Sequence, residues 1–187
     1  DINKDGLITQ NELVVGDSLK FLGRSAPHVE MTFSPGMDLF SSMIRVTASL
    51  DYKGGFLLKN STERIRCQTN TNCRGVADAT APLAEQARVV AVRDHPSRTQ
   101  AGFWDPGEFT KLREVAVTFN VPKNWSDRGF LVRDRISMTL AGRNIKTWTR
   151  FTGVDPEMAA GAQGDVQDPF QAVPPPTYYT FRLNFGF

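Results

Sequence analysis

The first twelve residues carry the side chains with the clearest potential for chemistry. Asp, Asn, Asp, Gly and Glu stand at positions 1, 3, 5, 6 and 12, which is the spacing of a twelve-residue calcium loop. The glycine permits the sharp turn that brings the oxygens of both halves around one hard cation. The pattern predicts a Ca²⁺ staple in a loop, and the alternative is a simple turn rich in Asp and Asn. The expected ligands are Asp1, Asn3, Asp5, Leu7 through its carbonyl, Thr9 directly or through a water, and Glu12 through both carboxylate oxygens.

Cys67 and Cys73 are the only cysteines in the chain, and the residues between them are polar. In an oxidising compartment such a pair predicts an exposed disulfide that closes a small ring and stabilises its loop modestly. A metal site or a catalytic cysteine is less favoured. His28 and His95 are the only histidines, and neither belongs to a recognisable catalytic grouping.

The remaining polar residues argue against two broad function classes. The chain has 187 residues, 22 Lys and Arg against 20 Asp and Glu, and a net charge of +2, without the basic block that nucleic-acid binding requires. Two carboxylate pairs, Asp105 with Glu108 and Asp155 with Glu157, fall in expected loops, where solvated charges are the favoured interpretation over a glycosidase pair. We therefore expect no enzyme, and a hydrolase domain ranks last.

Five stretches alternate apolar and polar residues with a period of two, the pattern of strands with one apolar and one polar face. A tight turn is expected at Ser34–Met37 between the first two, and a short helix is expected over 81–92. The apolar members are Val29, Met31 and Phe33; Ile44, Val46, Ala48, Leu50 and Tyr52; Val115, Val117, Phe119 and Val121; Ile136, Met138 and Leu140; and Tyr179, Phe181, Leu183, Phe185 and Phe187.

The spacing of these stretches favours a transmembrane β-barrel. Connections alternate between short and long, as they do between the periplasmic turns and extracellular loops of outer-membrane barrels, and most stretches reach the ~9–11 residues of a spanning strand. The polar faces carry charges that a water-filled lumen accepts: Arg45, Asp51, Arg135, Arg143 and Arg182. A soluble antiparallel sheet with one solvated face is the alternative. Five strands cannot close a barrel, so we expect a piece of a longer chain.

A C-terminal phenylalanine preceded by alternating apolar residues resembles the assembly signal of bacterial outer-membrane proteins, here Tyr179, Phe181, Leu183, Phe185 and Phe187. Further segments, in this order, resemble the C-terminal end of SusC/RagA-type TonB-dependent outer-membrane transporters, and the likeness covers nearly the whole chain. These segments are residues 1–6, 34–36, 52–55, 104–114, 141–149 and 152–157.

This resemblance implies a bacterial outer-membrane location and a barrel of about 22 strands with a plugged lumen. It implies import of oligosaccharides or peptides, energised through the TonB system and often shared with a SusD-like surface lipoprotein. The barrel-assembly machinery would recognise the last strand. The plug and the TonB-contacting segment have no counterpart in these residues.

The expected organisation is therefore an all-β fold: about five antiparallel C-terminal strands of a transmembrane β-barrel with long extracellular loops. Residues 1–26 would form an external loop with the calcium turn, and residues 27–187 the barrel segment, with long loops at 53–108 and 145–176. Trp104, Trp125 and Trp148 would lie in the interfacial aromatic belts or pack in loops. The competing interpretation is a secreted calcium-binding β-sheet module with an adhesive or carbohydrate-binding role.

Overall fold

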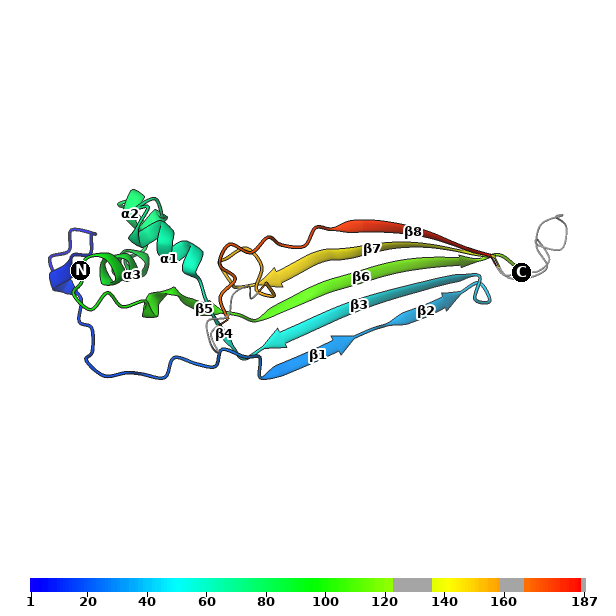
Figure 1. The fold of residues 1–187 in the computed structure, drawn as a ribbon, viewed down its shortest axis with the longest axis horizontal. Helices are drawn as coiled ribbons and strands as arrows, with labels where there is room; N and C mark the ends of the chain where they lie inside the picture. The colour runs from blue at the N-terminus through cyan, green and yellow to red at the C-terminus, as the bar shows by residue number, and fades with distance from the viewer. Residues whose placement is uncertain (123–135, 159–166, 186–187) are drawn as a thin grey trace. The chain divides into compact units, whose positions relative to one another are not determined.

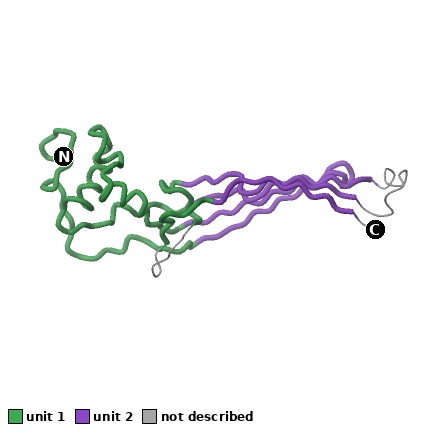
Figure 2. The backbone as a smooth tube through the Cα atoms, turned by 45° about the horizontal axis from the view of Figure 1, so that its top comes forward, with its two compact units in different colours: residues 1–28, 55–108, 150–174 green, residues 29–54, 109–149, 175–187 purple. Residues whose placement is uncertain are grey.

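The computed structural model describes residues 1–122, 136–158 and 167–185. The chain divides into two compact units, which Figure 2 colours separately. Unit 1 comprises residues 1–28, 55–108 and 150–174, and unit 2 comprises residues 29–54, 109–149 and 175–187. Unit 2 holds the alternating stretches, and unit 1 holds the segments that precede or connect them.

Unit 2 is one antiparallel sheet, as the alternation predicts (Figure 1). The strand order is β1-β3-β6-β7-β8, and β2 also pairs with β3. The described part of this sheet therefore has six strands rather than about five. Its strands are β1 (Val29–Phe33), β2 (Gly36–Leu39), β3 (Ile44–Gly54), β6 (Phe109–Asn120), β7 (Ile136–Thr149) and β8 (Tyr178–Phe185).

The tight turn expected at Ser34–Met37 is wrong. β1 and β2 both pair with β3 and form one edge strand with a short interruption. Pro35 has no N–H to donate, but its carbonyl still accepts a hydrogen bond from the Ala48 N–H (3.0 Å), an arrangement that edge strands tolerate. The reversal comes later, where Phe40 accepts from the Met43 N–H (3.1 Å) and residues 40–42 have positive φ.

The strands are long. β3 has 11 residues, β6 has 12 and β7 has 14, and β8 has 8 up to the last described position. Because neighbouring strands are antiparallel, the connections β3–β6 and β7–β8 leave the sheet at the same end. Both are long, whereas the reversal between β2 and β3 at the other end is short.

The chain is mostly β, as expected, and its few α-helices lie in unit 1, where three of them fall within residues 61–93. The predicted helix over 81–92 is confirmed as α3, whereas the other two helices were not expected. No helix in the described part of the chain has the length and apolar character needed to cross a membrane. The elements of unit 1 are η1 (Gln10–Glu12), β4 (Leu57–Lys59), α1 (Ser61–Gln68), α2 (Arg74–Ala77), α3 (Leu83–Arg93), η2 (Ala101–Phe103) and β5 (Trp104–Pro106).

Local chemistry explains why these helices form where they do. Asn60 caps α1, because its side-chain oxygen accepts the N–H of Glu63 (3.0 Å). Gly75 lets α2 approach α3 closely, since a Cβ there would lie 2.8 Å from the Glu85 carbonyl oxygen. The helices and η2 enclose a small core of Cys67, Cys73, Val89, Val92 and Phe103, each at most 1% exposed.

Candidate functional site

The pairing register gathers the apolar residues of the sheet on one face. One row runs without interruption across five strands: Met37 pairs with Val46, then Val117, Leu140 and Phe181. The side chains of this face are half-buried on β3 and mostly exposed on the edge strands, with 66% at Phe33 of β1 and 67% at Phe181 of β8. The described residues of unit 2 belong to the sheet or to short segments at its strand ends, so these residues form no second layer over the face.

The opposite face carries a matching set of polar rows. One row places Ser49 beside Glu114, Glu114 beside Arg143, and Arg143 beside Tyr178. Cross-strand partners on this face form hydrogen bonds and ion pairs, the contacts that stabilise a polar sheet surface. They include Lys53 with Glu30 (3.2 Å), Thr32 with Asp51 (2.9 Å), Thr118 with Thr139 (2.9 Å) and Asn184 with Ser137 (3.2 Å).

Two register irregularities concentrate charge at the row that begins with Ser49. The pairing shifts between Ser49 and Leu50 of β3 and again between Leu112 and Glu114 of β6, so that Arg113 is an extra residue. Such bulges re-aim side chains. The Nε of Arg113 donates to Asp51 (2.7 Å), and the Nε of Arg143 donates to Glu114 (2.5 Å).

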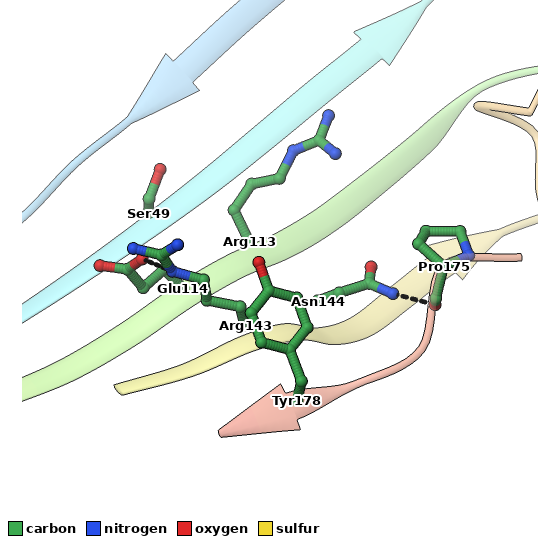
Figure 3. A pocket seen from close by; sticks show the side chains of 7 residues that line it. All are labelled: Ser49, Arg113, Glu114, Arg143, Asn144, Pro175 and Tyr178. Atoms are coloured by element: carbon green, nitrogen blue, oxygen red, sulfur yellow. Dashed lines mark hydrogen bonds and ion pairs between the residues drawn. The ribbon is translucent and has the colours of Figure 1, made fainter. Parts of the chain in front are cut away.

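The result is an open pocket of about 520 Å³ on the polar face, and Figure 3 labels the side chains that line it. Arginine, glutamate, amide, hydroxyl and phenol groups from four strands line it. Asn144, with a φ of 51°, donates its side-chain amide to the Pro175 carbonyl at the rim. The lining residues are Ser49, Arg113, Glu114, Arg143, Asn144, Pro175 and Tyr178.

Sequence reasoning missed this cluster for an identifiable reason. The extra residue Arg113 breaks the period of two, so the alternation identifies apolar members only from Val115 onward, although β6 starts at Phe109. Asn144 lies in the same irregularity of β7, which continues to Thr149 through residues expected to be loop. The sequence signal of such a bulge is an apolar/polar alternation that changes phase by one residue and then continues.

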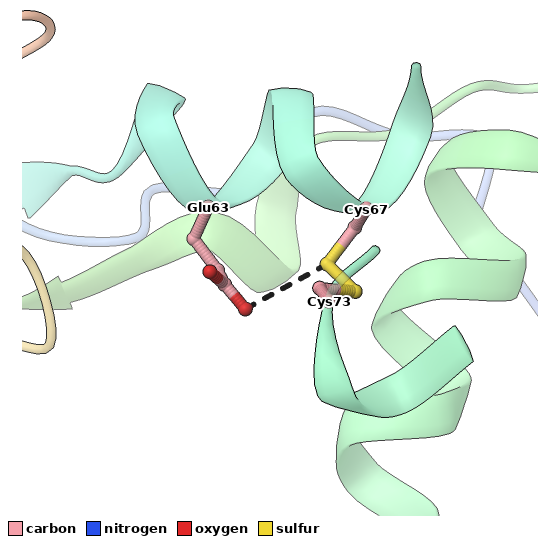
Figure 4. Close-up of side chains that lie close together, drawn as sticks. All are labelled: Glu63, Cys67 and Cys73. Atoms are coloured by element: carbon pink, nitrogen blue, oxygen red, sulfur yellow. Dashed lines mark hydrogen bonds between the residues drawn. A yellow bond between two sulfur atoms is a disulfide. The ribbon is translucent and has the colours of Figure 1, made fainter. Parts of the chain in front are cut away.

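The two cysteines stand at disulfide-bonding distance, with Cα atoms 5.0 Å apart (Figure 4). Glu63 of α1 lies beside the pair, and its Oε1 is 3.8 Å from the Cys67 sulfur. These are the only three carboxylate, thiol or imidazole groups in the described ranges whose ligand atoms lie within 4.8 Å of one another. Because the sulfurs are bonded to each other, they offer no thiolates to a metal. The geometry therefore favours a structural disulfide, which is buried and not exposed as expected, because both cysteines are 0% exposed within the helical cluster.

The predicted calcium loop folds back on itself in unit 1. Asp1 accepts hydrogen bonds from the N–H groups of Asp5 and Gly6 (both 3.1 Å), and Asp5 accepts from the Leu7 N–H (2.8 Å). Gly6 has a φ of 82°, the left-handed conformation that the turn requires. Glu12 closes the loop, because its carboxylate accepts from the N–H of Ile2 (2.7 Å).

Thr9 and Glu12 form a capping box at the start of η1. The N–H and the hydroxyl of Thr9 donate to Oε2 of Glu12 at 2.8 and 2.9 Å. These bonds, with the one from Ile2, lower the pKa of Glu12 from 4.5 to about 2. Glu12 is therefore ionised at neutral pH, as a bidentate calcium ligand must be.

The oxygen donors of this loop suit a hard cation, but they are not drawn tightly together. The carboxylates of Asp1, Asp5 and Glu12 do not all come within 4.8 Å of one another. Like charges repel, and each carboxylate instead faces backbone N–H groups of the loop. The amide nitrogen of Asn3 also donates to Asp5 (2.9 Å). Ion binding would need a small inward movement of these side chains.

Other predicted residues have mixed outcomes. Tyr179, Phe181, Leu183 and Phe185 lie on the apolar face of β8, whereas Phe187, Trp125 and Arg135 lie outside the described residues. Trp148 is half exposed in β7, and Trp104 begins β5. The expectation of solvated carboxylates is wrong for Asp155, which is only 6% exposed and accepts the Glu157 N–H (2.9 Å).

No family model matches the chain, and no curated protein matches it either. Among solved structures, the RagAB peptide transporter is similar, with a TM-score of 0.51, 15% identity and 74% of this chain covered. The RagAB peptide importer matches in its closed-closed state (TM-score 0.53, 16% identity, 79% covered) and in its open-open state (0.52, 17%, 86%). The matches span only 16–18% of those chains. The likeness shows a shared fold.

Proposed function

We propose that this chain forms part of the barrel wall of a bacterial outer-membrane, TonB-dependent importer. The observation that carries the proposal is the two-faced sheet. Its apolar rows are exposed on one side, and its charged and hydroxyl rows are held by cross-strand pairs on the other. A sheet in water would have to cover the apolar face, whereas a barrel wall turns it toward acyl chains and its polar face toward the lumen.

The resemblance to SusC/RagA-type transporters adds the cargo class and the partners. In this proposal the importer takes oligosaccharides or peptides, receives energy through the TonB system and works with a SusD-like lipoprotein. The solved neighbours are described as RagAB peptide transporters or importers, which favours peptides. The β8 aromatics would serve as the assembly signal for the barrel-assembly machinery.

Accessibility labelling of single cysteines tests the wall assignment. In outer membranes containing the full-length protein, Thr180→Cys and Thr139→Cys on the polar face should react with a water-soluble maleimide. Phe181→Cys and Leu140→Cys, their neighbours on the apolar face, should resist it. Equal labelling of both sets, together with a protein that stays monodisperse without detergent, would instead support a secreted β-sheet module.

We also propose that residues 1–12 bind Ca²⁺ as a structural staple. Two observations favour this over a simple turn: the complete twelve-position pattern, and the closure of the loop by Glu12 onto the N–H of Ile2. Asp1, Asn3, Asp5 and Glu12 would contribute side-chain oxygens, Leu7 its carbonyl, and Thr9 a direct or water-mediated contact. The cation would neutralise three neighbouring carboxylates and lower the free energy of the closed loop.

Replacing Asp5 by Ala or Glu12 by Gln tests the staple. In the full-length protein, calcium should slow proteolysis within residues 1–22, and a chelator should reverse the protection. Neither variant should respond to calcium. Identical digestion of the unaltered protein with calcium and with chelator would reject the staple and leave the barrel-wall proposal standing.

A further inference from the structure

Gln86 of α3 makes an unusual set of contacts with the candidate calcium loop. Its side chain is 5% exposed, although glutamine is mostly a surface residue. Its Nε2 donates to the Gly6 carbonyl (3.0 Å) and to the Ala81 carbonyl (2.9 Å), while its Oε1 accepts the Ile8 N–H (2.9 Å). The amide is therefore paired at both ends, as a buried polar group must be.

These contacts enclose one residue of the loop. Gly6 and Ile8 flank Leu7, whose carbonyl is the only backbone ligand in the predicted calcium set. By fixing the carbonyl before Leu7 and the N–H after it, Gln86 restricts rotation of both peptide groups that determine where the Leu7 carbonyl points. A side-chain amide suits this role, because its nitrogen donates to the Gly6 carbonyl while its oxygen accepts the Ile8 N–H.

The support behind Gln86 is rigid. Val89 and Val90, within the next helical turn of α3, are 1% and 8% exposed, and Val89 packs with the bonded cysteines Cys67 and Cys73. A side chain that projects from such a helix holds its amide in place better than one on a loop would.

We propose that Gln86 is a positioning residue of the calcium site, setting the Leu7 carbonyl toward the ion without contacting the ion itself. The proposal rests on calcium binding by residues 1–12. Hydrogen bonds that orient ligands from outside the coordination shell commonly contribute 10- to 100-fold to metal affinity. Loss of the Gln86 amide should therefore weaken calcium binding while every ligand remains.

Calorimetric titration of the chelator-treated full-length protein with CaCl₂ tests this. Asp5→Ala, which lacks a ligand, gives the background to subtract. Gln86→Ala should bind calcium about 10-fold more weakly than the unaltered protein. Gln86→Glu keeps the size but loses both donated bonds, so it should weaken binding as well and excludes a simple packing defect.

Gln68→Ala is the matched control. Gln68 is a partly buried glutamine of α1, and its Nε2 donates to the Val92 carbonyl of α3 (3.2 Å). It should alter the stability of the helices and leave calcium affinity within about twofold.

Three outcomes separate the claims. Weakened binding in both Gln86 variants but not in Gln68→Ala supports the positioning role. Unchanged affinity in the Gln86 variants, even with faster hydrogen exchange of α3 in chelator, overturns it and leaves calcium binding intact. If the unaltered protein binds calcium no better than Asp5→Ala does, both the calcium site and the role of Gln86 are overturned.

Discussion

The two units treat their large apolar side chains in opposite ways. In unit 1, Phe103, Leu58 and Val92 are at most 1% exposed. Exposed apolar residues of this unit lie mainly outside the helices, in residues 14–22 and at Ile2, Val154 and Val173. In unit 2, Leu140 and Phe181 are 58% and 67% exposed. One chain thus contains a core of the kind that water imposes and a sheet face that water would disfavour.

This difference in apolar exposure indicates the surroundings in which each unit would be stable. Helices, a disulfide and a buried cluster give unit 1 an apolar core of its own. Unit 2 satisfies its backbone hydrogen bonds within the sheet but leaves a continuous apolar row at its surface. That combination fits a hydrocarbon environment, where backbone groups must be hydrogen-bonded within the protein and an apolar face is stable without a covering layer.

The largest expected effect comes from Phe103→Ala in unit 1. Phe103 is 1% exposed within the cysteine and valine cluster, so its loss should leave a cavity and cost about 3–5 kcal/mol of unit 1 stability. Hydrogen exchange should accelerate across 61–93 while the strands of unit 2 keep their protection. Phe33→Ala is the control: Phe33 is 66% exposed, and fluid lipid would fill the space. Equal losses in both variants would contradict the contrast between the units.

A smaller effect is expected from Leu140→Arg, which places a charge in the middle of the apolar row of β7. Arginine on the lipid face of a barrel costs about 2–4 kcal/mol at the bilayer midplane. Unfolding by urea from lipid vesicles should therefore shift to lower concentration. Thr139→Arg, the adjacent residue on the polar face, should shift it much less. If the two substitutions are equally costly, the apolar face does not contact lipid.

Much of unit 2 could be predicted from the alternation alone, because a strand with different surroundings on its two faces records them in every second residue. The assignment of Leu140 and Phe181 to one face needed no structure. The bulged residue Arg113 was not predictable in the same way, since one inserted residue inverts the period. The prediction of a turn at Ser34–Met37 was wrong because proline and glycine also occur in interrupted edge strands.

Unit 1 was harder to predict from sequence. α1 is polar over much of its length, and its position depends on the Asn60 cap and on contacts of Cys67 within the cluster. The calcium pattern is local and was visible at once. Its contact with Gln86 was not, because residues about 80 positions apart share no periodicity.

The smallest expected effect is a pH-dependent opening of the loop that Glu12 closes in unit 1. The pKa of Glu12 is about 2 against an ordinary 4.5, chiefly because Thr9 and Ile2 donate hydrogen bonds to its carboxylate. A lowered pKa means that the ionised form favours the closed loop. This contribution is complete above pH 4.5 and is lost as the pH falls through about 2.

Pepsin, which is active in this acid range, can report the opening in the presence of a calcium chelator. Cleavage between Ile2 and Leu13, normalised to an unfolded reference peptide, should rise as the pH is lowered from 4.5 toward 2. Glu12→Gln does not titrate at that position, so its normalised cleavage should be higher at pH 4.5 and should change less on acidification. A flat profile for the unaltered protein would mean that Glu12 does not hold the loop closed, because protonation weakens its carboxylate as an acceptor of the hydrogen bonds from Thr9 and Ile2.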